Sequence, residues 1–206
     1  MNVSLVNSPD STTMSKCTYL LVVLLFLACG GKTSLVDDIR VMQSTPIDLC
    51  LDSLQYYIPE SDNQADIDSV SFYQRKTSLV VYTDSSACSS CTLKSMYHWL
   101  GFLDEIRKRY GEGMAVYFIF SPKKTQMYDF NNALQTLYLE YPVFIDTANV
   151  FLRHNAHIPS NKSCHIFLID QDGWVKLVGS PQHNLKMKEL LFEISDELIK
   201  NQNERR

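Results

Sequence analysis

The sequence has little excess charge and no cluster of charge of one sign. Its 206 residues carry a formal net charge of −4, and no run or stripe of lysine and arginine is present. A protein that binds a nucleic-acid backbone normally presents such a basic surface, so we do not expect nucleic acid as a partner. Internal repeats and low-complexity tracts are also missing. The length and the 45% hydrophobic content fit one globular domain with an additional segment.

The sequence also lacks an apolar run near its N-terminus that is long enough to cross a bilayer as a helix. Residues 19–28 form an apolar run of about half the roughly 20 residues that a spanning helix needs. The run follows Lys16 and precedes Cys29 and two glycines, which is typical of a secretory signal. Leu27–Ala28–Cys29 resembles the lipobox of bacterial lipoproteins, with Phe26 where leucine is usual.

The lipobox resemblance implies that Cys29 is acylated and becomes the mature N-terminus. We therefore predict a signal segment over residues 1–28, a lipidated tether over 29–45 and a folded domain over 46–206. The alternatives are a plain secretory signal and an uncleaved anchor. A polar leader is unusual in a signal peptide, so we expect translation to start at Met14.

The sequence contains six cysteines, so each can be considered separately. Two of the six, Cys17 and Cys29, lie within or directly after the signal segment. The four in the domain are Cys50, Cys88, Cys91 and Cys164. An exported protein is in a compartment where disulfides form and persist, and four thiols allow three pairings. Only the pair at 88 and 91 is close in sequence, and no histidine has the spacing of a zinc motif with its neighbours.

The order of the expected elements indicates an α/β fold. Short apolar runs predict strands, and apolar residues at intervals of three and four predict helices. The predicted strands are 79–82, 114–120, 143–145, 165–170 and 174–178, with one or two more within 44–58; the predicted helices are 93–110, 125–139 and 185–199. Strands that alternate with helices predict a mostly parallel sheet with right-handed crossovers. A hairpin turn at 171–173 makes this sheet mixed, with helices on both faces.

The sequence Cys88–Ser89–Ser90–Cys91 falls between the first of these strands and the first long helix. A CxxC at this junction, followed by FLID at 167–170 and the QDG turn, resembles the thioredoxin superfamily, in particular its membrane-anchored members in bacterial envelopes. The resemblance covers residues 45–200 and implies a three-layer, thioredoxin-like α/β sandwich. It also implies thiol–disulfide exchange in the cell envelope, with a protein client and a separate electron donor or acceptor.

The two cysteines are expected to differ in role. Cys88 is placed at the helix N-terminus, where unpaired N–H groups and the helix dipole favour a thiolate and so lower its pKa. It is therefore the attacking sulfur. Cys91, one turn later and less exposed, resolves the mixed disulfide by attacking Cys88. No cofactor is required, and the motif does not fix whether the client is oxidised or reduced.

The loop before the strand that begins with His165 departs from the family. Matching FLID to FLID places Cys164 where relatives carry a proline that positions substrate, and Pro159 is the other candidate for that role. If this loop folds against Cys88 and Cys91, a third thiol or an imidazole joins them, although neighbours in a strand point to opposite faces. Such a set suits zinc or cuprous copper, so the alternative function is a metal-binding or redox-inactive module. The simpler interpretation of Cys164 is a small buried hydrophobe.

Two other features carry less weight. A peroxidase of the peroxiredoxin type needs a threonine three residues before its reactive cysteine, but Ser85 stands there and Thr83 is five residues before. Relatives of thioredoxin often carry an acidic group beneath the dithiol. Asp84 is the carboxylate nearest to it in the sequence, and we interpret it as a loop residue.

Overall fold

A computed structural model describes residues 34–57, 75–137, 141–182 and 184–204. The predicted signal segment, the lipobox and Cys29 lie outside the described residues. Within the described ranges no helix combines the length and the apolar character needed to cross a membrane.

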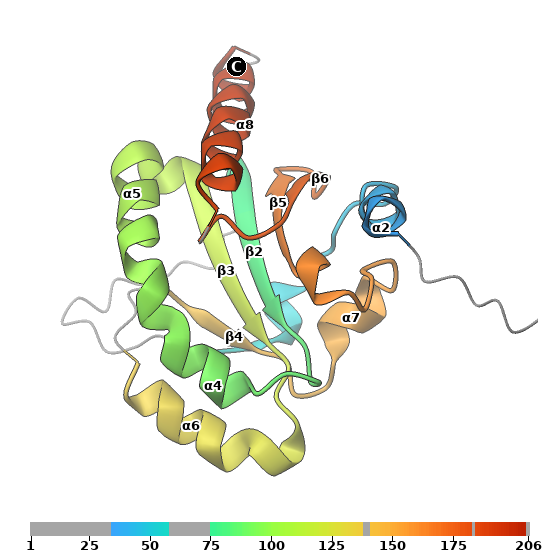
Figure 1. Ribbon diagram of the computed structural model, residues 1–206, viewed down its shortest axis with the longest axis vertical. Coiled ribbons are helices and arrows are strands. Elements are labelled where there is room, and N and C mark those ends of the chain that lie inside the picture. The colour runs from blue at the N-terminus through green and yellow to red at the C-terminus, as the bar shows by residue number, and fades with distance from the viewer. Residues whose placement is uncertain (1–33, 58–74, 138–140, 183, 205–206) are drawn as a thin grey trace, which may run out of the picture. The chain divides into compact units, whose positions relative to one another are not determined.

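The described residues form a six-stranded mixed sheet through the middle of the domain (Figure 1). Across the sheet the strands are β1 (Gln55–Tyr57), β4 (Val143–Ile145), β3 (Met114–Phe120), β2 (Thr77–Thr83), β5 (Ile166–Asp170) and β6 (Val175–Val178). Strands β2, β3 and β4 are parallel, and the other neighbouring pairs are antiparallel. The order β3-β2-β5-β6 is that of the thioredoxin-like fold, which β4 and β1 extend at one edge. This confirms the predicted fold class.

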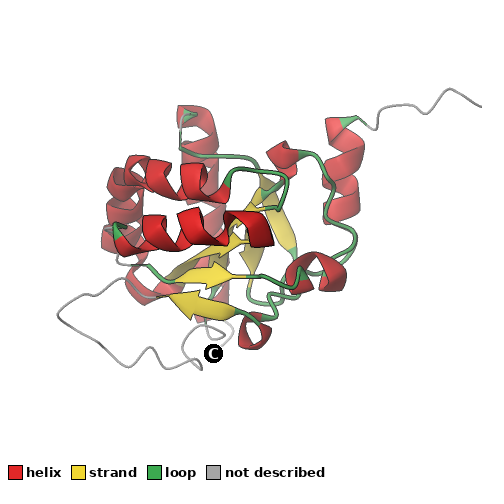
Figure 2. Cartoon of the chain, turned by 90° about the horizontal axis from the view of Figure 1, so that it is seen from below, coloured by secondary structure: helices red, strands yellow, loops and turns green. Residues whose placement is uncertain are grey.

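Helices cover both faces of the sheet, as Figure 2 shows from below. One face packs against α4 (Ser89–Lys94), α5 (Leu100–Tyr110), α6 (Met127–Gln135) and α8 (Leu185–Asn203), and the other against α2 (Leu35–Met42) and α7 (Val150–His154). The path of the chain explains this division. Two crossovers take the chain from β2 to β3 and then to β4 over the first face. It returns over the second face through α7, which places β5 on the free side of β2.

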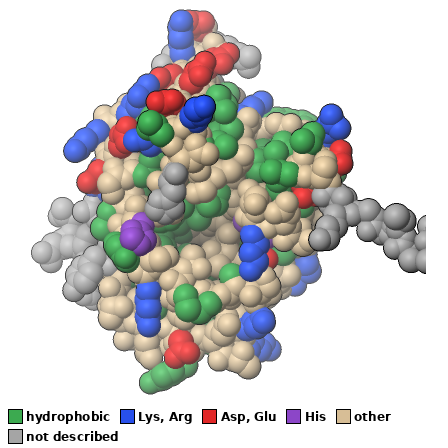
Figure 3. Space-filling model, in the orientation of Figure 1, with side chains coloured by type: hydrophobic (Ala, Val, Ile, Leu, Met, Phe, Trp, Pro, Cys, Tyr) green, Lys and Arg blue, Asp and Glu red, His purple; other side chains and the backbone are tan. Residues whose placement is uncertain are grey.

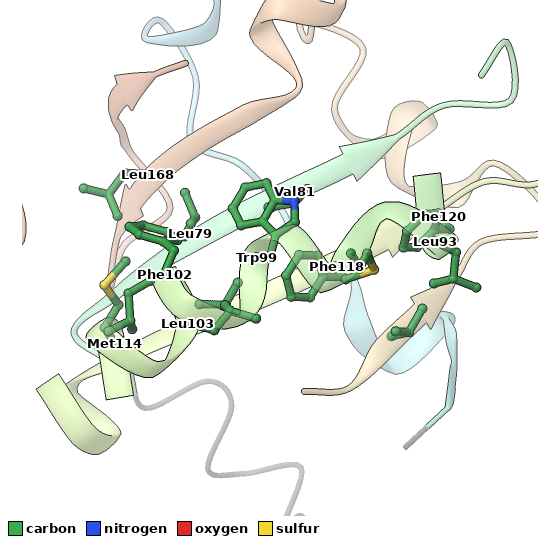
Figure 4. Close-up of a cluster of buried hydrophobic side chains, with 14 of the residues drawn as sticks. Leu79, Val81, Leu93, Trp99, Phe102, Leu103, Met114, Phe118, Phe120 and Leu168 are labelled. Atoms are coloured by element: carbon green, nitrogen blue, oxygen red, sulfur yellow. The ribbon is translucent and has the colours of Figure 1, made fainter. Parts of the chain in front are cut away.

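The two central strands are buried along their whole length, as expected for parallel strands covered on both faces. Alternate residues of β2 divide between the two apolar clusters, with Leu79 and Val81 on the α5 face and Val80 on the other. In Figure 4, Trp99 lies between the central strands and α5, with its ring 5.8 Å from that of Phe118. The core is therefore continuous on the face that carries the CxxC helix.

The long helix predicted over 93–110 is interrupted. It consists of α4, a 3₁₀ turn over Ser95–Trp99 and then α5. The Ser95 hydroxyl donates to the Thr92 carbonyl at 2.8 Å, and such local side-chain bonding competes with the regular helix. The apolar spacing survives the break, which is why periodicity alone did not reveal it.

Other predicted boundaries also change. The helix predicted over 125–139 is a 3₁₀ turn at Lys124–Gln126 followed by α6, and the segment 44–58 contains β1 and a 3₁₀ turn at Leu51–Ser53. Part of the predicted tether is folded, because α2 lies within 29–45 and its Met42 is fully buried in the core. The larger compact unit therefore already includes Leu35.

Gly173 is the one position in the β5–β6 turn where a side chain does not fit. Its φ is +83°, and a Cβ there would lie 2.6 Å from the Ile47 carbonyl oxygen. The Asp170 carboxylate accepts hydrogen bonds from the amides of Asp172 and Trp174, which fixes the turn. The predicted QDG hairpin is confirmed, and it also packs against the segment that enters the domain.

We expect Asn155→Ala to lower the free energy of unfolding by about 2 kcal/mol. Asn155 is fully buried, and its amide bonds the Asp48 carbonyl, the Asp48 N–H and the Phe151 carbonyl at 2.7–2.9 Å. Its loss removes these partners of the Asp48 N–H and carbonyl, while the Phe151 carbonyl keeps the bond from the backbone amide of residue 155. Urea unfolding measures the change, with Asn201→Ala on exposed α8 as the control expected to stay within about 0.5 kcal/mol. Equal stability of both variants would contradict the assignment.

Candidate active site

Cys88 and Cys91 form a disulfide at the start of α4, with their Cα atoms 5.3 Å apart. Central strand β2 ends at Thr83, and Cys88 is the N-cap residue of α4, in an extended conformation. This places the pair beyond the carboxyl end of β2, where ligands and substrates approach in parallel α/β sheets. Both cysteines are exposed. The disulfide is therefore open to attack by another thiol.

Cys91 is exposed, like Cys88. We expected Cys91 to be less exposed than Cys88, and the short helix α4 shields neither of them. Their remaining difference is their place in the helix. Cys88 precedes the first turn, and its sulfur lies 3.6 Å from the Ser90 hydroxyl. Cys91 is one turn into the helix. Only Cys88 therefore lies where free helical amides favour a thiolate.

Asp84 shapes the loop that carries Cys88. Its Oδ1 accepts hydrogen bonds from the Ser86 amide at 2.8 Å, the Ser86 hydroxyl at 2.7 Å and the Ala87 amide at 3.2 Å. Burial alone would raise the pKa of Asp84, but these bonds from Ser86 and the nearby His165 and Lys162 hold it below its usual value. The carboxylate therefore stays charged at neutral pH. Asp84 is more than a linker residue, because it fixes the turn directly before Cys88.

The loop over residues 159–165 lies next to this turn through His165. The side chain of His165 is buried, and its Nδ1 is 3.9 Å from Asp84 Oδ2. Its Nε2 is 3.0 Å from the Pro159 carbonyl oxygen, and its own carbonyl accepts from the Tyr82 amide at 2.8 Å. The structure thus brings the predicted residues Pro159 and His165 to the loop that carries the dithiol. We find no cis peptide bond among the described residues.

Cys164 does not join the dithiol. It is fully buried in the apolar cluster of α2 and α7, on the face of the sheet opposite α4. Burial, together with the charge of Asp38, raises its pKa. Cys164 and His165 are not part of a strand, so their side chains need not point to opposite faces of the sheet. Cys164 is the last residue of a 3₁₀ turn, and His165 follows that turn directly before β5. Among the described residues no three cysteine, histidine or carboxylate side chains gather as a metal site would require. The structure therefore does not support the alternative of a metal site formed by Cys164 with the dithiol, and it places Cys164 as a small buried hydrophobe.

Cys50 is a second free thiol, and it is partly buried. Burial raises its pKa to about 11, and the charges of Asp48 and Asp146 act in the same direction. At neutral pH it is almost entirely protonated and a poor nucleophile. The structure thus indicates that the cysteines differ in reactivity as nucleophiles, which the sequence did not show.

We expect iodoacetamide to modify Cys88 of the fully reduced protein at pH 7 about a hundredfold faster than Cys50, because only the thiolate reacts. Quenching at short times and mapping the modified peptides by mass spectrometry gives both rates from one sample. Cys164 is the internal control, and it should react only after unfolding. Comparable rates for the three thiols in the folded protein would contradict this ranking.

Sequence patterns did not identify the contact between Asp84 and His165. The triplet Asp84–Ser85–Ser86 after a strand is typical of a turn capped by an aspartate, and that signal was available. His165 is 81 positions further along the chain, and nothing local relates it to this turn. Only the pairing of β2 with β5 brings the two together.

No protein-family model and no curated protein matches the sequence. Among solved structures, the fold is similar to the exposed lipoprotein thioredoxin of Streptococcus pneumoniae, with 23% identity over 62% of this chain and 89% of that chain and a TM-score of 0.43. A thiol:disulfide interchange protein DsbE of Chlorobium tepidum has 18% identity over 63% and 84%, and a TM-score of 0.43. A thioredoxin-like protein of Porphyromonas gingivalis has 16% identity over 61% and 76%, and a TM-score of 0.40. The assignment of the fold rests on the strand order.

Proposed function

We propose that the protein is a thiol–disulfide oxidoreductase of the thioredoxin superfamily. The observation that carries the proposal is the exposed Cys88–Cys91 disulfide at the start of α4, beyond the end of the central strand β2. Both residues of this disulfide are exposed, so a client thiol or disulfide can approach them. The two other described cysteines are free and have raised pKa values, so they do not compete for exchange.

The exchange needs only the two sulfurs. In the reducing direction, the Cys88 thiolate attacks one sulfur of a client disulfide, forms a mixed disulfide and releases one client thiolate. The Cys91 thiol then loses its proton and attacks the Cys88 sulfur, which releases the second client thiolate. The client gains two electrons and the enzyme disulfide forms. A dithiol partner returns the electrons by the same steps in reverse, and an oxidising cycle runs the sequence backwards.

Cys88 takes the attacking role because of its position. As the N-cap residue it faces amides of the first helical turn that have no partner within the helix. The Ser90 hydroxyl, 3.6 Å away, can donate a hydrogen bond to the sulfur. Cys91 lies within the helix and lacks this stabilisation. The loop at Pro159 and His165, held beside the Asp84 turn, forms the proposed edge along which the client approaches.

The proposed location is the bacterial cell envelope, with the protein attached to the membrane through a lipid on Cys29. The support is the lipobox-like sequence, which precedes the folded domain by only a few residues. Mass spectrometry of the mature protein from membranes tests this point: a diacylglyceryl adduct on an N-terminal Cys29 is expected. A peptide that continues unmodified through residues 26–32 would contradict it.

Reduction of insulin disulfides by dithiothreitol provides a test with a defined substrate. The full-length protein at micromolar concentration is expected to accelerate precipitation of the insulin B chain about tenfold over dithiothreitol alone, since a lowered thiolate pKa speeds the exchange. The variant Cys50→Ser serves as a matched control and should retain the full rate. No acceleration by the folded, reduced protein would contradict the proposed function.

A further inference from the structure

Asp84 and His165 form a contact that does not involve the two reacting sulfurs. It brings a buried imidazole to a carboxylate that shapes the dithiol loop. The exposed fractions of the two side chains are 6% for His165 and 15% for Asp84, so water screens the pair only weakly. Each partner also anchors its own segment. Asp84 holds the amides of Ser86 and Ala87, and His165 holds the Pro159 carbonyl.

The hydrogen bond to Pro159 fixes the tautomer of the neutral ring. A carbonyl oxygen only accepts, so the 3.0 Å contact requires the proton on Nε2. Nδ1 of neutral His165 then carries a lone pair, and it faces Asp84 Oδ2 at 3.9 Å without a hydrogen bond. Protonation places a new N–H on Nδ1 towards that oxygen. The contact then becomes a charge-assisted hydrogen bond, which is shorter and stronger than a neutral one.

Protonation of His165 therefore changes the electrostatics of the dithiol loop. With a neutral ring, the negative charge of Asp84 acts on the loop that carries Cys88 and opposes a second negative charge there. With a protonated ring, the pair is neutral overall. The Cys88 thiolate is then easier to form, while Oδ1 still holds the turn.

None of the other described groups near the His165 ring takes the place of Asp84 as its negatively charged partner. The ring of Tyr82 packs against it at 5.2 Å, and burial raises the pKa of that phenol to about 12, so Tyr82 stays neutral. Lys162 is exposed and adds a positive charge near Asp84. Asp146 lies beyond the Tyr82–Ser121 contact, and its carboxylate is engaged by the amides that begin α7. Asp84 is thus the carboxylate for which the structure gives a contact with His165.

We propose that His165 is a positioning residue for thiol exchange, which acts through Asp84 and makes the reactivity of Cys88 depend on the protonation of the imidazole. This inference rests on the proposed function, because it assigns a regulator to the same dithiol. The coupling is expected to be at least about two- to fivefold, which is the upper part of the range for exposed ion pairs.

The first test is the pH profile of Cys88 alkylation in the reduced, full-length protein between pH 5 and 8. The wild type is expected to show two ionisations, one of Cys88 and one of an imidazole, the side chain that changes charge within this pH range. His165→Gln places an amide N–H where Nε2 was and keeps the bond to Pro159, but it does not titrate. This variant should show one ionisation and react about two- to fivefold more slowly at pH 5.5. A profile with the wild-type shape in His165→Gln would overturn the proposal.

The second test does not depend on exchange activity. Nitrogen NMR of the His165 ring in the folded protein is expected to show the Nε2–H tautomer at high pH. Asp84→Asn keeps an acceptor for the loop amides but removes the charge, and it should weaken proton binding by His165 about two- to fivefold. An unchanged titration would overturn the coupling even if insulin reduction succeeds. Failed insulin reduction with the expected titration would instead reject the proposed function alone.

Discussion

Cys88→Ser is expected to abolish thiol–disulfide exchange, with a rate about a thousandfold or more below that of the wild type. Serine has nearly the same size, so the helix N-cap at this exposed position stays intact. An alcohol does not attack a disulfide at neutral pH, and the two free thiols, Cys50 and Cys164, have raised pKa values. The insulin assay measures the loss, and thermal unfolding of the variant confirms the fold.

Cys91→Ser gives the complementary result because it removes only the resolving sulfur. The client should then remain attached to Cys88 as a mixed disulfide, stable to boiling and released by dithiothreitol. Cys50→Ser is the matched control, since it removes an unreactive thiol from the same domain. A mixed disulfide that forms equally well in Cys88→Ser would show that Cys88 is not the attacking sulfur.

Phe118→Ala is expected to destabilise the fold by about 3–5 kcal/mol, the largest change in stability that we predict. Phe118 is 1% exposed in the middle of β3, and it contacts Trp99, which anchors the segment between α4 and α5 (Figure 4). Its removal leaves a cavity between the sheet and the helix that carries the dithiol.

Urea unfolding of Phe118→Ala and Tyr128→Ala gives a matched comparison of two aromatic side chains. Tyr128 is 78% exposed on α6, so its removal should change the free energy by no more than about 0.5 kcal/mol. If Phe118→Ala does not fold, Phe118→Leu with a loss of about 1 kcal/mol provides the same test. A loss for Phe118→Ala no larger than for Tyr128→Ala would contradict the described core.

The parts of the fold that could be predicted from the sequence are those that burial dictates locally. The continuous apolar run of β3 has the predicted bounds, and the QDG turn at Gly173 forms where its residues require it. Asn184 caps the last helix through its side chain, which accepts from the Met187 amide at 3.1 Å. The interrupted helix at Ser95 was missed because a local hydrogen bond leaves the apolar spacing unchanged.

In the candidate site too, the features set by local sequence could be predicted and those set by tertiary packing could not. The CxxC and its place at a helix N-terminus follow from a strand, a short loop and a helix that are adjacent in sequence. The exposure of Cys91, the burial of Cys164 away from the dithiol and the contact of Asp84 with His165 depend on tertiary packing. Aligning FLID at 167–170 with the family placed Cys164 at the position of the proline that positions substrate. In the structure, the 3₁₀ turn before β5 directs Cys164 into the apolar cluster on the face of the sheet opposite α4.

Acidic and basic side chains are mixed on the face of the molecule that Figure 3 shows. Figure 3 shows basic and acidic side chains interspersed over the C-terminal helix α8, with the ion pair of Arg109 and Asp196 joining it to α5. The formal net charge of −4 is spread over the chain.

A redox titration of the full-length protein tests the central claim most directly. The protein is equilibrated across ratios of reduced to oxidised glutathione, its free thiols are alkylated, and the modified peptides are mapped by mass spectrometry. We predict one reversible Cys88–Cys91 couple between about −120 and −270 mV, the range from a strong oxidant to thioredoxin, and its position gives the direction of exchange. A Cys88–Cys91 pair that stays oxidised well below this range, or that never forms, would contradict the account.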